Sequence, residues 1–155
     1  MSEEINDVVR AKRFELMDDE GQVRAFLDTG PADEALLTFY ESDGEAFRVS
    51  LGINQEGTAQ LNLFDNHKTS RLQVATQAAG KLTLVTLSDE FGRGRVQLSL
   101  FSDGRTGLAV SDQWGVARAT FQVTEDGQPG LYFHDEDGNP IEGGSDSPYS
   151  KGHNR

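Results

Sequence analysis

Histidines and acidic clusters are the residues of this chain that could bind a metal ion. The three histidines, His67, His134 and His153, do not form pairs with the spacing of HxxxH or HExxH. The segment 135–139 (DEDGN) resembles the start of a calcium loop, but the twelve-residue loop with its closing glutamate is absent. We therefore predict no metal site and no cofactor, and we interpret the acidic clusters as turns.

Catalytic motifs that combine a nucleophile with an acid and a base are also absent from the sequence. It contains neither a GxSxG elbow nor a glycine-rich phosphate loop, and abundant serines and aspartates do not by themselves make a triad. The segment 91–97 (FGRGRVQ) looks like a phosphate- or RNA-binding stretch, yet it coincides with one turn and strand of an internal repeat. The sequence therefore predicts a protein that is not an enzyme.

Trp114 is the single tryptophan, and it stands in the middle of a predicted turn. An aromatic ring at a loop tip can stack on a sugar or anchor a protein partner. The alternative is that the ring folds back over a neighbouring hairpin or lies in an oligomer interface. A trefoil lectin would carry Gln-x-Trp in several copies, whereas here Gln113 and Trp114 are adjacent and occur once.

The elements that must position these residues come from a repeat, which is clearest at 108–120 (LAVSDQWGVARAT). Its turn glycine recurs at Gly21, Gly44, Gly92, Gly115 and Gly138, and Lys68 occupies the same slot in one copy. The steps between these positions are 23 or 24 residues. Each copy has alternating apolar residues on both sides of an acidic turn, and a second set of glycines separates the copies. This pattern predicts an array of six β-hairpins.

Six hairpins give about twelve antiparallel strands, which must hide their edges. We expect an all-β fold in which they form a closed barrel or toroid, or a sandwich. A β-trefoil and a stacked β-solenoid are the alternatives. The segment 8–11 (VVRA) repeats the wording of the return strands, while the last copy stops before its return strand is complete. An N-terminal strand that pairs with the last hairpin would close a ring or cap an oligomer contact.

The turns allow two registers, which differ by one residue. Asp at the first position and Gly at the fourth indicate a type I turn, closed either as a three-residue loop with a bulge at Gly or as a four-residue loop. The four-residue loop places Leu16 opposite Val23, Leu61 opposite Leu72, Val85 opposite Val96 and Leu108 opposite Ala119. Because this register gives one apolar and one polar face, we predict it, with Val110 on the apolar face and Arg118 on the polar face.

Arginines recur after the turns at Arg24, Arg71, Arg95 and Arg118. In the predicted register they form a column on the outer, polar face, which they share with Glu15, Asn62, Thr86 and Ala109. One interpretation is a set of surface ion pairs with the nearby acids, each contributing about 0.2–1 kcal/mol. The other is a ladder that binds an anionic partner.

Composition limits the partners and the compartment. The formal charge of -12 disfavours binding to nucleic acid and to anionic membranes, because both would repel the chain. The absence of cysteine, of a signal peptide and of an apolar membrane span favours a cytoplasmic protein, although export without a cleaved signal stays open. We expect one domain at 8–141, with flexible ends at 1–7 and 142–155.

The repeat motif FxLxDxxGxxRAxL, as at 14–27 (FELMDDEGQVRAFL), resembles that of uncharacterised bacterial β-hairpin repeat proteins. The opening segment RAKRFELMD is also similar to the way such chains begin. The resemblance extends over about 8–141, with departures at Lys68 and in the longer fourth copy. It implies an all-β repeat and carries over no catalytic residue.

Together, these patterns predict a non-enzymatic structural, assembly or protein-interaction domain, which contacts a protein partner or itself through its regular hairpin turns. The alternative is a β module that binds carbohydrate or another small ligand. The candidate binding residues are Trp114 and the four arginines of the column.

Overall fold

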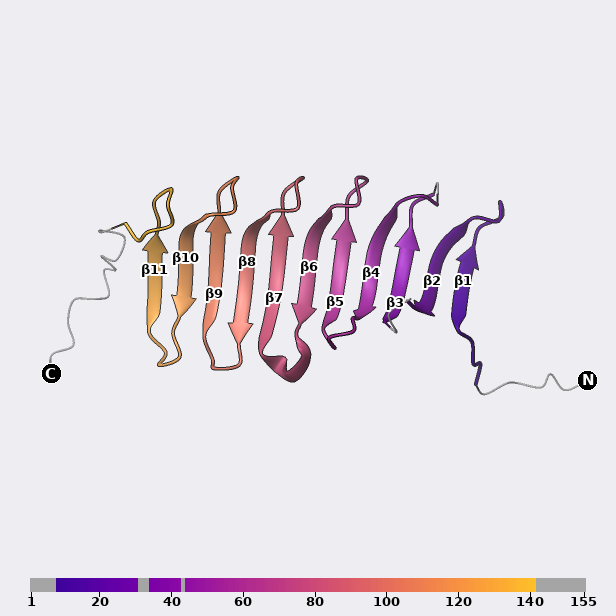
Figure 1. The fold of residues 1–155 in the computed structure, drawn as a ribbon, viewed down its shortest axis with the longest axis horizontal. Helices are drawn as coiled ribbons and strands as arrows, with labels where there is room; N and C mark the ends of the chain where they lie inside the picture. Colours follow the sequence, from indigo (N-terminus) through magenta and orange to yellow (C-terminus); the bar gives the residue numbers. More distant parts are fainter. Residues whose placement is uncertain (1–7, 31–33, 43, 142–155) are drawn as a thin grey trace, which may run out of the picture.

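The computed structural model describes residues 8–30, 34–42 and 44–141, which form one antiparallel sheet of eleven strands in chain order (Figure 1). The strands are β1 (Arg13–Met17), β2 (Val23–Thr29), β3 (Ala35–Tyr40), β4 (Phe47–Ile53), β5 (Ala59–Phe64), β6 (Ser70–Thr76), β7 (Leu82–Ser88), β8 (Gly94–Phe101), β9 (Thr106–Ser111), β10 (Ala117–Val123) and β11 (Pro129–Phe133). A short 3-10 turn, Ala78–Gly80, precedes β7. The all-β hairpin array is confirmed, and the predicted flexible ends lie outside the described residues.

The sheet is open, so the predicted closed barrel or toroid is wrong. Each strand pairs only with its neighbours in the chain, and β1 and β11 lie at opposite ends of the sheet. Residues 8–11 form no strand, and they do not join the last hairpin. Because residues 8–30, 34–42 and 44–141 form one layer, this part of the chain is not a sandwich, a trefoil or a stacked solenoid either.

The register explains why the sheet does not close. One row of paired residues crosses the sheet and contains Phe14, Leu61 and Leu131. Each of these residues precedes the first residue of its own turn by the same number of positions, so the row keeps a constant distance from the acidic turns. A barrel needs tilted strands and a stagger that accumulates around the sheet. Hairpins whose paired rows keep the same distance from the turns accumulate no stagger along the sheet, and a sheet without stagger does not close.

The hairpin turns use the loop that the sequence interpretation rejected. In the first hairpin the amide of Asp18 donates to the carbonyl of Gln22, and the amide of Gly21 donates to the carbonyl of Asp18, at 3.0 Å each. Gly21 has a φ of 80°, as the bulge position of a three-residue loop requires. The same pattern recurs at the other acidic turns, except that the second closes as a four-residue loop between Glu41 and Ala46.

A second bulge follows each of the first five turns and was not predicted. In the first hairpin Met17 pairs with Val23 but Leu16 pairs with Ala25, so Arg24 is the inserted residue. The two irregularities together shift the register by two residues from the predicted one. The predicted pairs are therefore wrong: Leu16 faces Ala25, Leu61 faces Val74, Val85 faces Leu98 and Leu108 faces Phe121. An even shift preserves the faces, so the predicted division into an apolar and a polar face is confirmed.

The apolar face consists of three rows of side chains that cross the sheet. The turn row, nearest the acidic turns, is Leu16, Ala25, Phe39, Val49, Leu63, Leu72, Leu87, Val96, Val110, Ala119 and Phe133. The central row is Phe14, Leu27, Leu37, Leu51, Leu61, Val74, Val85, Leu98, Leu108, Phe121 and Leu131. The loop row is Thr29, Ala35, Ile53, Ala59, Thr76, Thr83, Leu100, Thr106, Val123 and Pro129. No member of these rows is charged.

Nothing in the described residues covers this face. The only buried apolar residues among them are Ala25, Ala46 and Ala75, whereas Val110, expected to be buried, is 43% exposed. Buried polar residues lie on the opposite face: Thr38 and Asn62, with Asn62 accepting a hydrogen bond from Gln73 at 3.2 Å. The reason is architectural, because one sheet layer cannot bury its own apolar face.

Lys68 departs from the turn glycines, and its φ of 63° is a left-handed conformation that strains a residue with a side chain. We expect Lys68→Gly to raise the free energy of unfolding by about 1 kcal/mol, because glycine adopts this conformation without a Cβ penalty. Urea denaturation followed by circular dichroism measures the change.

Lys81 is the matched control, because its φ is -66°. Lys81→Gly makes the same chemical change in an ordinary conformation, so it should lower the stability by about 0.5–1 kcal/mol. If both substitutions lower stability equally, the turn at Lys68 is not strained.

Candidate interaction surfaces

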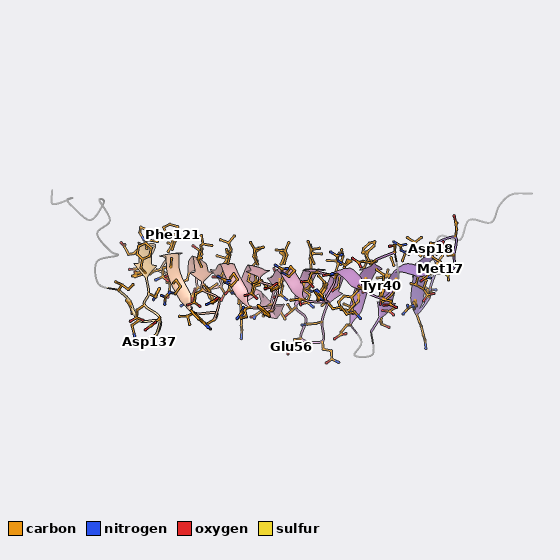
Figure 2. All side chains as sticks on the ribbon, turned by 90° about the horizontal axis from the view of Figure 1, so that it is seen from above. Met17, Asp18, Tyr40, Glu56, Phe121 and Asp137 are labelled. Atoms are coloured by element: carbon orange, nitrogen blue, oxygen red, sulfur yellow. The ribbon has the colours of Figure 1, made fainter. Side chains whose placement is uncertain are left out.

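The apolar face is the largest candidate surface of the described chain. Leu16, Leu51 and Leu98 expose 63%, 50% and 50% of their surface, and Phe121 exposes 52%. Figure 2 shows Phe121 on one side of the sheet, among side chains made mostly of carbon, and Glu56 on the other. Contiguous apolar patches of more than a few hundred Å2 mark interaction sites in soluble proteins.

The arginines of the predicted column lie at the second bulges, where Arg71 and Arg95 each link their own turn to the next hairpin. The Nε of Arg71 donates to the carbonyl of Ser88 at 2.9 Å, and its guanidinium lies 3.3 Å from the Asp65 carboxylate. The Nε of Arg95 likewise donates to Ser111 at 2.9 Å. These bonds tie successive hairpins together at the end where the bulges interrupt the strand ladder.

The end members of the column are less completely bonded. Arg24 lies 3.5 Å from Asp18, and Arg118 lies 3.8 Å from Asp112. The Nε of Arg24 and the Nη1 of Arg118 are buried without a hydrogen-bond partner. Arg95 lies 3.7 Å from Asp89, so all four arginines contact the acid of their own turn. This favours the structural interpretation, and the binding of an anion to them stays a prediction.

Arg48 is a fifth member that the sequence analysis missed. Its Nε donates to the carbonyl of Phe64 at 2.7 Å, and its guanidinium pairs with Glu41. It was missed because its turn is one residue longer, so it follows Gly44 by four positions rather than three. The regular steps from Arg24 to Arg48 and from Arg48 to Arg71 were the signal in the sequence.

In five of the six turns the first acid is an aspartate whose carboxylate accepts backbone amides, and in four of these an arginine lies beside the carboxylate as well. The Asp18 carboxylate accepts the amides of Gln22 and Glu20 at 2.9 and 3.0 Å, and these bonds, with Arg24, hold its pKa below the ordinary value despite partial desolvation. Asp89 also has a lowered pKa. Desolvation raises this pKa, but the amides of Arg93 and Phe91 and the Arg93 guanidinium together lower it by more. The ionised carboxylates therefore stabilise the turns.

Acid should remove this stabilisation. A carboxylate with a lowered folded pKa stabilises the protein above its unfolded pKa of about 4, and the effect is lost as the pH falls through the folded pKa. We expect the urea midpoint to change little from pH 7 to pH 5 and to fall between pH 4 and pH 2. The substitution Asp89→Asn should reduce this fall, because an asparagine keeps the turn without titrating.

Asn54 shows that an amide suffices for the turn, since its Oδ1 accepts the amides of Glu56 and Thr58 at 3.1 and 2.9 Å. The control is Asp19→Asn, which removes the same charge from the middle of a turn. An equal effect of both variants on the acid-induced fall would mean that net charge, and not the turn geometry, sets the acid sensitivity.

Trp114 lies at the tip of the turn between β9 and β10 and is 72% exposed, so its ring does not fold back over a neighbouring hairpin. Phe91 takes the equivalent position in the preceding copy, and it is 71% exposed. The Arg93 guanidinium lies 4.6 Å from the Phe91 ring centroid. Both rings are exposed at the turn end of the sheet, where they could contact a sugar or a protein.

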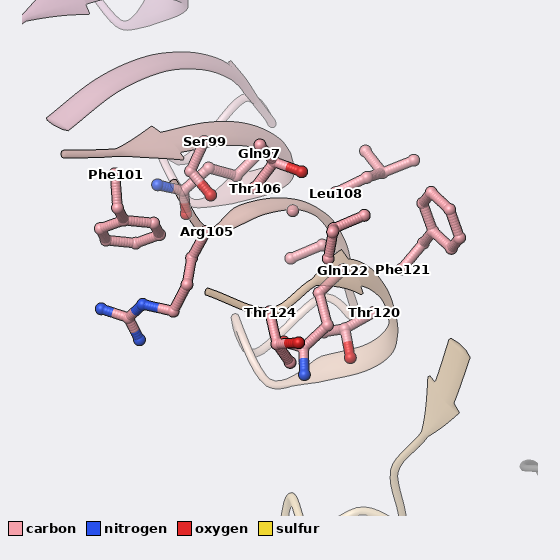
Figure 3. Close-up of a pocket in the computed structure, with 13 residues that line it drawn as sticks. Gln97, Ser99, Phe101, Arg105, Thr106, Leu108, Thr120, Phe121, Gln122 and Thr124 are labelled. Atoms are coloured by element: carbon pink, nitrogen blue, oxygen red, sulfur yellow. The ribbon is translucent and has the colours of Figure 1, made fainter. Parts of the chain in front are cut away.

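A shallow hollow of about 370 Å3 on the polar face was also not predicted. Figure 3 shows Gln97 and Ser99 on one side of it and Thr120 and Gln122 on the other. The hollow exists because Gly107, which pairs with Ser99 and Gln122, has no side chain to fill it. Its amides and hydroxyls could bind a polar ligand. Trp114 does not line it.

Among the described residues, no three histidine, aspartate or glutamate side chains come together as a group that could hold a metal ion. No helix in the described parts of the chain has the length and apolar character needed to cross a membrane. The sequence matches no protein-family model, and no curated protein matches it.

Proposed function

We propose that this chain is a non-enzymatic assembly module that associates through the apolar face of its sheet. One observation supports this proposal above all: the turn, central and loop rows are uncharged, contiguous and uncovered in the described chain. Covering apolar surface releases roughly 25 cal/mol per Å2, so such a face gains strongly from a partner. The exposed turns, which the sequence suggested as the contact surface, carry only two large aromatic rings.

The polar face supports this assignment by contrast. Its arginines are bonded to turn acids and to backbone carbonyls, and Thr38 and Asn62 are buried there. The polar face thus satisfies many of its hydrogen-bonding and charged groups within the chain. The apolar face, by contrast, has no second layer of described residues to cover its side chains. Association is therefore expected on the side without charges.

Hydroxyl-radical footprinting of the unmodified protein tests the proposal. Phe39 and Phe121, on the apolar face, expose 41% and 52% of their surface in the single chain, and Phe91 at a turn tip exposes 71%. We expect Phe39 and Phe121 to be strongly protected from oxidation while Phe91 reacts freely, because only the apolar face is covered in solution. If the three rings react in proportion to these exposures, the face is free and the proposal is wrong.

Binding of a carbohydrate or another small polar ligand is the second candidate, and the hollow beside Gly107 favours it. The amide groups of Gln97 and Gln122 and the hydroxyl of Thr120 line the hollow, as sugar recognition requires. A glycan array tests this function. Loss of binding in Gln122→Ala would place the ligand in the hollow, and loss in Trp114→Ala would place it at the turn. No binding by the unmodified protein would contradict this candidate.

A further inference from the structure

The sheet is unusually flat for its width. Figure 1 shows β1 and β11 running nearly parallel to each other, and Figure 2 shows the sheet extending almost straight when seen from above. Adjacent strands normally rotate by about 20–25° relative to one another, and flat sheets of many strands are typically stabilised by stacking. A flat apolar face fits a flat partner.

The face is large enough for a stable interface. Eleven strands spaced about 4.8 Å apart, with three alternate residues each, make a surface of about 50 by 17 Å, or roughly 850 Å2. A stable protein–protein interface buries about 800 Å2 on each partner. A second sheet of the same size would therefore cover this face completely.

Side-chain sizes along each strand show how a second sheet would fit. In β3, β5 and β7 the large residue is in the turn row and the small one is in the loop row: Phe39 with Ala35, Leu63 with Ala59 and Leu87 with Thr83.

Three of the alternate strands reverse this order. In β4, β8 and β10 the larger residue lies in the loop row: Ile53 with Val49, Leu100 with Val96 and Val123 with Ala119. Each of these six strands thus has a larger and a smaller residue at the two ends of its apolar side. Two layers interdigitate best when large residues face small ones.

On this basis, which rests on the function proposed above, we propose that a second copy of this chain covers the apolar face. The two sheets stack with their strands antiparallel, so that each strand lies over its own counterpart in the other copy. The turn row of one copy then faces the loop row of the other, and Phe39 lies over Ala35 and Leu63 over Ala59. The central row faces itself.

The other two-fold stacking of two copies fits less well. With the turns of both copies at the same end, strand order is reversed across the interface, and the turn rows face each other. Ala25 would then lie over Ala119 and leave a void, while Leu63 would meet Leu87. Voids and overpacking both destabilise an interior, so this arrangement is disfavoured.

Pairing through the sheet edges is also disfavoured. The edge strand β1 carries the charged Arg13 and Glu15, and the other edge strand, β11, begins with Pro129. Charges and proline are devices that protect edge strands. The amide of Ile141 also donates to the carbonyl of Phe133, which uses part of the β11 edge within the chain. The face, and not the edge, is left open to a second copy.

Spin labels on single cysteines test this arrangement, because the chain has no cysteine of its own. Glu15, Gln73 and Tyr132 lie in one row of the polar face, on β1, β6 and β11, so the labels stay outside the interface. The variants are E15C, Q73C and Y132C, each measured alone by double electron–electron resonance. If each strand covers its counterpart, all three variants give a distance between the two spin labels of the dimer within about 35 Å. This limit is the sum of the separation of the two stacked sheets, about 10 Å, and the lengths of the two label side chains.

Every other arrangement gives a different pattern. Stacking with reversed strand order gives a short distance for Q73C but distances near 50 Å or more for E15C and Y132C, since ten strand spacings separate the ends. Edge pairing gives a short distance for E15C or Y132C alone, and a monomer gives no dipolar coupling. Each of these results would overturn the inference. If footprinting still shows the face protected, the proposed function stands and a different occupant or geometry covers the face.

Discussion

Replacing Leu98 with lysine is expected to convert the proposed dimer to a monomer. Leu98 lies in the central row on β8, between Val85 and Leu108, and it would face Leu98 of the second copy. Two ammonium groups would then meet in an apolar interface, where neither has a partner. We expect dimer affinity to fall by a factor of 10³ or more, which corresponds to about 4 kcal/mol. Light scattering over a range of protein concentrations measures the loss.

Gln97→Lys is the matched control, because Gln97 directly precedes Leu98 in the same strand and lies on the polar face. It adds the same charge outside the interface, so the dimer should persist. A Leu98→Lys protein that keeps the mass of the unmodified one would contradict the role of the apolar face. If Leu98→Lys unfolds, circular dichroism shows it, and the expected interpretation is that the sheet depends on its partner for stability.

Gly52→Ala is expected to destabilise the sheet by about 3 kcal/mol. A Cβ at this position of β4 would lie 2.2 Å from the backbone carbonyl oxygen of Ala35 and 2.7 Å from Cδ2 of Leu36. The carbonyl belongs to the neighbouring strand, so the backbone of β3 or β4 must shift to make room, and overpacking of this kind costs about 1–3 kcal/mol or more. Urea denaturation of both proteins gives the difference in unfolding free energy.

Gly107 on β9 provides the comparison, since an added Cβ would meet its nearest atoms at 3.6 and 3.7 Å, which is ordinary contact. Gly107→Ala should therefore change stability by less than about 0.5 kcal/mol, and in the stabilising direction, because alanine loses less backbone entropy on folding. A large cost at Gly107, or none at Gly52, would mean that strand spacing differs from that described.

The repeat, its turns and the two faces could be predicted from the sequence because each depends on local chemistry. Asp18 and Gly21 define the turn by hydrogen bonding and by a positive φ, and the alternation of residues such as Leu61 and Asn62 defines the faces. The pairing of individual residues could not be predicted, because it required two successive bulges whose effects on the faces cancel. A hydrophobic pattern distinguishes odd shifts of register from even ones, but it does not distinguish a shift of zero from a shift of two.

Closure could not be predicted, because it depends on the stagger between strands as well as on their number. Whether eleven or twelve strands close depends on how pairing shifts from strand to strand, and in this chain the shift is nil. The candidate binding residues show the same limit. Arg71 can be recognised in the sequence because arginine recurs after the turns, and Trp114 because it is the single tryptophan. The uncovered apolar face is visible only once the sheet is known to be one layer.

The constant distance of the paired rows from the turns gives the sheet an approximate translational symmetry along its width, so that each repeat adds two strands with little rotation. In a chain built in this way, the number of repeats sets the width of the sheet across its strands. The apolar face of such a sheet is covered completely only by a partner sheet with the same number of strands. The larger and smaller residues of that partner must also follow one another in the matching order. Selection among otherwise similar chains could thus be made by counting repeats, and a copy with one repeat fewer would leave two strands of apolar surface in water.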